Sequence, residues 1–70
     1  MRDPNRIDTV VNALADCWRD FPDLRFGQII ENIASYNKKT ESEVWNMEEN
    51  EWLKCIQKFR DENKDKYHRP

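Results

Sequence analysis

The spacing of apolar residues constrains the fold of this chain more than any other feature. In the first third of the sequence they recur every three or four positions, which is the repeat of an α-helix with one buried face. This stripe consists of Ile7, Val10, Val11, Leu14, Cys17, Trp18 and Phe21. Asp3 can cap the start of the helix and Pro4 suits its first position, whereas Pro22 disfavours helical geometry at the residue before it. A helix is therefore predicted over residues 4–21.

A second apolar stripe follows almost at once and predicts a helix over residues 24–36. Its buried positions are expected to be Phe26, Ile29, Ile30 and Ile33, with Leu24 and Ala34 at the edges. Isoleucines also favour strands, but Gln28, Glu31 and Asn32 fall on the opposite face of a 3.6-residue repeat, which favours the helix. Asp23 is the expected N-cap.

A third helix is predicted over residues 48–63. Three glutamates crowd its first turn, where carboxylates interact favourably with the helix dipole. Its core stripe is Trp52, Leu53, Ile56 and Phe59, with Cys55 alongside. Beyond Arg60 the periodicity fades into charged residues, so residues 64–70 are expected to be a frayed or disordered tail.

The connection near residues 41–47 allows two interpretations. It can be an extended segment or turn that places Trp45 in the core. Alternatively, Thr40 and Glu43 have the spacing of a capping box, which would open a single helical turn. With 70 residues the chain has room for one core. The fold class expected is therefore all-α, a compact three-helix domain over residues 1–63.

The chemistry-bearing residues do not form a catalytic or metal-binding pattern. The single histidine, His68, lies in the predicted tail, so no rigid pair of nucleophile and base can be built from it. Two cysteines far apart, Cys17 and Cys55, fall on apolar stripes and are expected to be buried thiols. With one glycine in all, there is no phosphate-binding loop. We expect no enzymatic activity, no cofactor and no metal.

Charge and hydropathy restrict the partners and the location. The net charge is −2 and the signs are interspersed, so the basic face typical of nucleic-acid binding is missing. No apolar run approaches the roughly 20 residues of a membrane span, and the N-terminus has no apolar signal region. A cytoplasmic, reduced location is expected, with no membrane partner.

The only glycine, Gly27, marks the segment with the most functional interest. A glycine in the first turns of a helix costs roughly 0.5–1 kcal/mol relative to alanine. It can serve a close crossing of the first and second helices, or it can offer open backbone to a partner beside Arg25 and Gln28. Trp45, on the connector, is the tryptophan most prone to exposure. Arg25, Gly27, Gln28 and Trp45 are the candidate partner-binding residues.

Several motifs of the chain resemble those of one family. They are an opening Arg-Asp-Pro-x-Arg-Ile, a tryptophan near the end of the first helix, the segment Pro-Asp-Leu-Arg-x-Gly-Gln at residues 22–28, and an apolar stretch leading into an acidic final helix. Together they are similar to a family of short, functionally uncharacterised bacterial and phage proteins. The resemblance covers roughly residues 2–60 and implies a bacterial or phage origin without an activity.

These observations lead to two hypotheses of different classes. The first is a small, non-enzymatic protein-interaction module that modulates a host protein through an unidentified protein partner. The alternative is a helix-turn-helix-like DNA-binding protein, since three short helices are the right material for one. A homodimer is compatible with both, because a small core with spare aromatic residues gains from burying them between chains.

Overall fold

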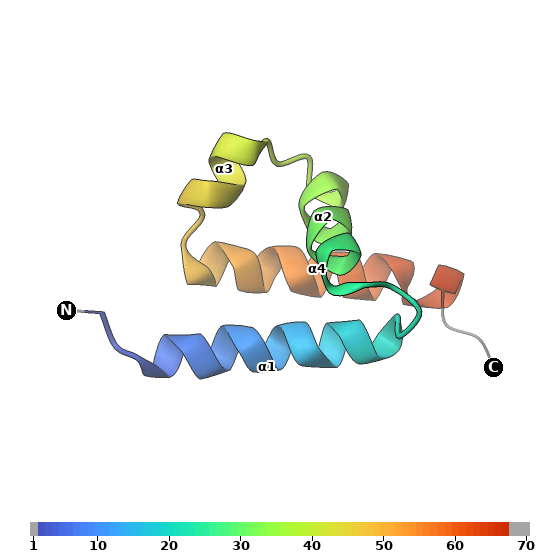
Figure 1. Ribbon diagram of the computed structural model, residues 1–70, viewed down its shortest axis with the longest axis horizontal. Helices are drawn as coiled ribbons and strands as arrows, with labels where there is room; N and C mark the ends of the chain where they lie inside the picture. The colour runs from blue at the N-terminus through green and yellow to red at the C-terminus, as the bar shows by residue number, and fades with distance from the viewer. Residues whose placement is uncertain (1, 68–70) are drawn as a thin grey trace.

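The computed structural model describes the backbone of residues 2–67 and the side chains of residues 2–63. Within that range it contains four helices and no strand: α1 (Asn5–Asp20), α2 (Phe26–Tyr36), α3 (Glu41–Asn46) and α4 (Glu49–Tyr67) (Figure 1). The all-α class is confirmed, and the three long helices correspond to the three predicted ones. Residues 68–70, which belong to the predicted tail, lie outside the described residues.

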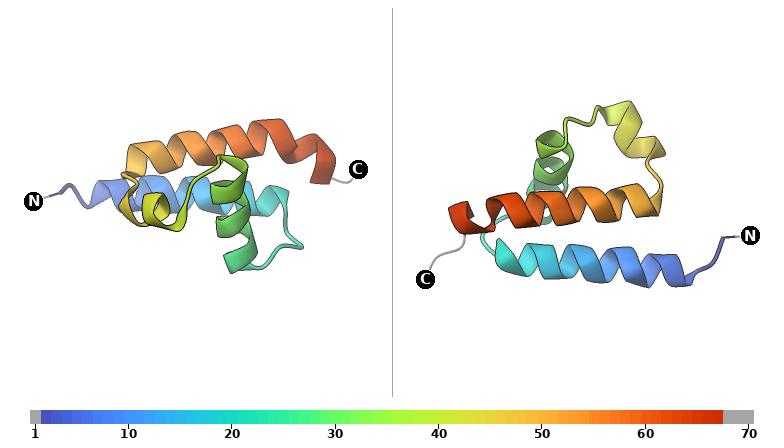
Figure 2. Two further views of the ribbon diagram at one scale, coloured as in Figure 1. Left: turned by 90° about the horizontal axis from the view of Figure 1, so that it is seen from above. Right: turned by 180° about the vertical axis from the view of Figure 1, so that it is seen from behind.

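The two longest helices, α1 and α4, lie side by side and run in the same direction (Figures 1 and 2). Ion pairs join them at both ends. Near their N-termini Arg6 Nε lies 3.2 Å from Glu49 Oε1, and near their C-termini Arg60 donates to Asp20. Such partly exposed pairs contribute about 0–1 kcal/mol each. Their position at both ends nevertheless favours one register of α1 against α4.

Because α1 and α4 are parallel, the chain must return along the molecule between them, and α2 and α3 make this return. Figure 1 shows α2 standing across the pair near the C-terminal end of α1, while α3 lies above the N-terminal end of α4. The arrangement is elongated, with extents of 44 × 25 × 19 Å. Since α2 covers only part of α1, the apolar stripe of α1 is not buried along its whole length.

The core lies where α1, α2 and α4 meet. Its buried members are Cys17, Phe21, Ile29, Ile33, Met47, Cys55, Ile56 and Phe59. The rings of Phe21 and Phe59 are 5.2 Å apart and join the end of α1 to α4. Most predicted core positions are confirmed. The prediction that Phe26, Ile7 and Val11 lie in the core is wrong, because these side chains are 57%, 52% and 53% exposed.

The helix starts differ in part from those predicted. α1 begins at Asn5 with Pro4 at the N-cap position, one residue later than predicted. Asp3 lies just before the cap, and its Oδ1 accepts the N–H of Asn5 at 2.9 Å. Asp23 is not the cap of α2, which begins two residues later than predicted, with Arg25 at the N-cap position. The reason is the turn before it, where the Trp18 indole donates to the carbonyl of Leu24 at 2.7 Å and holds that residue outside the helix.

The connector forms the short helix α3, as the capping-box alternative predicted. Thr40 Oγ1 accepts the N–H of Glu43 at 3.2 Å, and Glu43 Oε1 accepts the N–H of Thr40 at 3.0 Å. The alternative with Trp45 in the core is wrong, because this side chain is 88% exposed. Val44 is half-buried, and Met47 is buried in the core where Trp45 was expected.

The last helix, α4, begins at Glu49 and continues to Tyr67, past the predicted end at residue 63.

Candidate functional site

The four candidate partner-binding residues are all exposed, but they do not form one cluster. Arg25 is the N-cap of α2, Gly27 and Gln28 lie in its first turn, and Trp45 lies on α3. Of these, only Gly27 lines a depression between the two helices. Trp45 follows Val44, which lines the same depression from α3. Arg25 and Gln28 are close to Gly27 in sequence, but they do not line the depression that Gly27 lines.

The depression between α2 and α3, here called the α2–α3 hollow, has a volume of about 450 Å³. Its lining is Phe26, Gly27, Ile30, Glu31, Ala34, Ser35, Lys39, Glu41 and Val44. The apolar part comes mainly from α2, and the charged residues come from both sides. Lys39 Nζ lies 2.7 Å from Glu51 Oε2, so the charge of this lysine is largely neutralised. With Glu31 and Glu41 also at the hollow, its electrostatic character is acidic.

Gly27 does not serve a close crossing of helices. A Cβ atom built at this position would meet no atom within 4 Å, and the glycine does not have a positive φ. The expected contact of α1 with α2 at Gly27 is therefore wrong. What remains is open backbone that faces the α2–α3 hollow. The alternative role of Gly27, as backbone offered to a partner, remains a prediction.

Gln28 has a structural task at the start of α2. Its Oε1 accepts the N–H of Arg25 at 2.8 Å, which satisfies one of the backbone donors that a helix start leaves without a partner. The Gln28 side chain is thus held along the helix and is less free to reach a partner. Arg25 carries the exposed charge of this turn.

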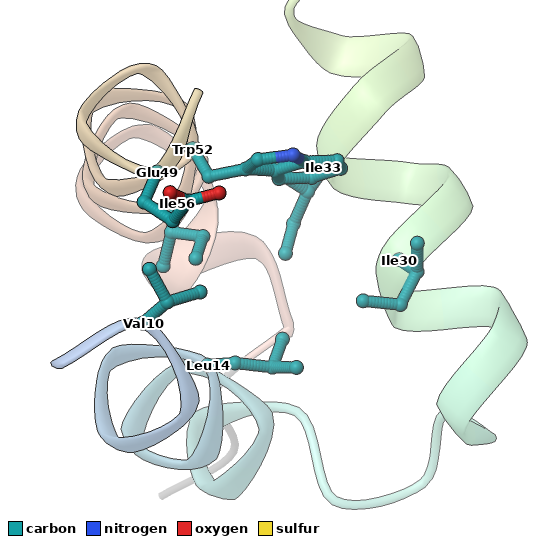
Figure 3. Close-up of a pocket in the computed structure, with 7 residues that line it drawn as sticks. All are labelled: Val10, Leu14, Ile30, Ile33, Glu49, Trp52 and Ile56. Carbon is teal, nitrogen blue, oxygen red and sulfur yellow. The ribbon is translucent and has the colours of Figure 1, made fainter. Parts of the chain in front are cut away.

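An apolar groove adjoins the hollow and was not predicted from the sequence (Figure 3). It has a volume of about 280 Å³, and its lining is Val10, Leu14, Ile30, Ile33, Glu49, Trp52 and Ile56. Ile30 borders both depressions. The helical repeat correctly predicts that the apolar members of this lining point inward, whereas Glu49 was not among the predicted inward residues. The repeat carries no information on the distance between α2 and α1. The groove is open because of the separation of these two helices.

The two cysteines are free and buried, as predicted. Burial raises the pKa of the Cys17 thiol to about 11, and it also raises the pKa of Cys55. A thiol with a raised pKa stays protonated near neutral pH and is a poor nucleophile. Among the described side chains, no group of three His, Cys, Asp or Glu residues is placed to hold a metal ion.

Comparison with known proteins gives no relative: no family model, no curated protein and no solved structure matches the chain. Membership of the bacterial and phage family suggested by residues 22–28 thus stays a prediction. Across residues 2–67, none of the helices has the length and apolar character needed to cross a membrane.

Proposed function

We propose that this protein is a small, non-enzymatic protein-interaction module that binds its partner with Trp45 and the α2–α3 hollow. The observation that carries the proposal is the 88% exposure of Trp45 on a folded helix. A large apolar side chain in water is costly, and burying an aromatic of this size covers about 150–250 Å². Tryptophan is also the residue type most enriched among those that dominate binding energy.

The position of Trp45 is held by the structure around it. The capping box of Thr40 and Glu43 closes the N-terminal end of α3, and the buried side chain of Met47 anchors its C-terminal end. Asn46 adds a bond from its Nδ2 to the carbonyl of Ser42 at 2.8 Å. A side chain presented by a fixed helix loses less conformational entropy on binding than one on a loop, which supports a role in recognition.

The α2–α3 hollow, which Val44 lines directly before Trp45 in the chain, supports a partner of a particular chemistry. Phe26, which is 57% exposed, and Ile30 offer apolar surface. Glu31 and Glu41 add negative charge, while Lys39 is paired with Glu51. A protein segment with an apolar side chain edged by lysine or arginine complements this surface. In a bacterium or phage, such a module would act by modulating the protein that carries this segment.

The proposal is tested by capturing the partner from the native cell with the wild-type chain and with Trp45→Ala. Trp45→Phe keeps an aromatic ring and serves as a graded variant, while Ser42→Ala on the same helix serves as the control. The expected result is one protein that the wild type, Trp45→Phe and Ser42→Ala recover and that Trp45→Ala does not. Equal recovery by Trp45→Ala would show that this surface is not the binding site. Salt-dependent binding of duplex DNA would favour the helix-turn-helix alternative instead.

A further inference from the structure

A second surface of the molecule lies on α1 and carries exposed apolar side chains. In Figure 1, α4 flanks α1 on one side, and the opposite side of α1 faces away from the rest of the molecule. Two large apolar side chains of α1, Ile7 and Val11, are 52% and 53% exposed. They begin a line that continues through Ala15 and Trp18, because at about 100° per residue these four positions fall within about 80° of one another.

The other end of this line is a shallow, open depression, here called the hole. Ala15, Trp18, Arg19 and Pro22 line a depression of about 300 Å³. Ala15, Trp18 and Arg19 lie on α1 with the spacing i, i+3 and i+4, so they share one side of the helix, and Pro22 closes the depression just beyond the helix end. This side of α1 thus carries an exposed apolar side chain, Ile7, near its start and the hole near its end.

We propose that α1 pairs with α1 of a second copy of this chain in an antiparallel homodimer. Ile7 and the centre of the hole are separated by about 17 Å along the helix, at 1.5 Å per residue. A two-fold axis near residues 12 and 13 places Ile7 of each copy in the hole of the other. One contact is thereby made twice, as closed two-fold symmetry requires. Val11 then lies at the centre of the interface.

The charges beside this line are complementary in the antiparallel arrangement. Asp8 and Arg19 flank the same face of α1, at about 100° and 120° from Ile7. Antiparallel pairing places Asp8 near Arg19 of the second copy, and this pair also forms twice. Arg19 Nη1 now lies 3.0 Å from Asp16 Oδ1, but both side chains are more than half exposed, so this pair is weak and open to exchange.

The rim of the hole adds apolar surface to the contact. Phe26 is 57% exposed, and its ring centroid lies 5.6 Å from that of Trp18, which lines the hole. Ile7 of the second copy would therefore cover part of this ring as well. A single pair of helices of this length buries roughly 1,000 Å², which is the size of a weak, reversible interface. The dimer does not rest on the proposed function, because Trp45 takes no part in it, although Phe26 borders both surfaces.

Sedimentation equilibrium of the full chain, over roughly three decades of concentration around the micromolar range, tests this dimer. The wild type is expected to pass from one chain to two as concentration rises. Val11→Lys places two positive charges near the two-fold axis and is expected to weaken association at least about 10-fold. Thr9→Lys, exposed on another side of α1, is the control and is expected to leave association unchanged. Circular dichroism shows whether each variant keeps its helices.

A charge exchange tests the antiparallel direction. Asp8→Arg alone and Arg19→Asp alone each place like charges together across the interface and are expected to weaken the dimer. The double variant restores opposite charges and is expected to associate more tightly than either single variant. If the wild type stays a single chain at every concentration, the proposal of a dimer is wrong. If Val11→Lys and Thr9→Lys associate equally well, this surface of α1 is not the dimer interface. A double variant no tighter than the single ones overturns the antiparallel pairing.

Discussion

At Gly27 the backbone of α2 is open on the side where a methyl group would point. Gly27→Ala is therefore expected to stabilise the fold by about 0.5 kcal/mol, because alanine loses less backbone entropy and meets no clash. Urea unfolding followed by circular dichroism measures this change. A loss of stability would contradict it and would mean that the first turn of α2 is more crowded than the structure shows.

The cysteine thiols are expected to resist modification in the folded chain. Burial raises the pKa of Cys17 to about 11 and also raises that of Cys55, so both must be exposed by an opening of the core before they react. The reaction of the native chain with a thiol reagent at pH 8 is expected to be at least about 100-fold slower than in denaturant. A thiol that reacts at the denatured rate would contradict the packing of the core.

Individual side chains were predictable where the helical repeat determined them. Cys17, Ile29 and Ile33 are fully buried, as their places on the stripes indicated. Phe26 lies on the same face of α2 as Ile30 and Ile33 and is nevertheless exposed, because the first turn of α2 extends past the edge of α1 and α4. The repeat shows which way a side chain points, but not whether another helix lies there.

Among the elements, α3 depends most on local interactions, since it has only six residues. Thr40→Ala removes the hydroxyl that accepts the N–H of Glu43 and is expected to cost about 1 kcal/mol, measured by urea unfolding at pH 7. An unchanged unfolding midpoint would show that packing of Val44 and Met47 alone determines α3.

The same capping box makes α3 sensitive to acid. Hydrogen bonds from Thr40 lower the pKa of Glu43 below its ordinary value of 4.5. A carboxyl group with a lowered pKa in the folded state stabilises the fold above its unfolded pKa, and this contribution disappears as pH falls through the folded pKa. The stability difference between the wild type and Glu43→Gln is therefore expected to be present at pH 7 and to shrink below about pH 4. An equal difference at both pH values would contradict this assignment.

The elements themselves could be predicted to different extents. The stripes of α1, α2 and α4 are long enough to establish a helical period, and Thr40 with Glu43 gave the start of α3. Six residues are too few for the spacing of apolar side chains to define the buried side of α3. The exposure of Trp45 could therefore not be predicted from that spacing. The start of α2 depends on the bond from Trp18 to Leu24, a contact between two elements that no local pattern contains.

At the scale of the whole molecule, the parallel pairing of α1 and α4 determines which surfaces remain open. Arg60 and Asp20 are far apart in sequence, and nothing in a single sequence indicates that they meet. The place where α2 crosses the pair follows from the same packing. This crossing of α2 leaves the groove, the α2–α3 hollow and the edge of α1 uncovered. Candidate residues could therefore be predicted from the sequence, but the surfaces to which they belong could not.

The proposed function depends on the side chain of Trp45. Isothermal titration of the captured and purified partner into the wild type and into Trp45→Ala tests it most directly. The expected result is at least a 10-fold rise in Kd for Trp45→Ala, which corresponds to about 1.4 kcal/mol, with Ser42→Ala unchanged within about twofold. Equal affinity of the wild type and Trp45→Ala would contradict the claim.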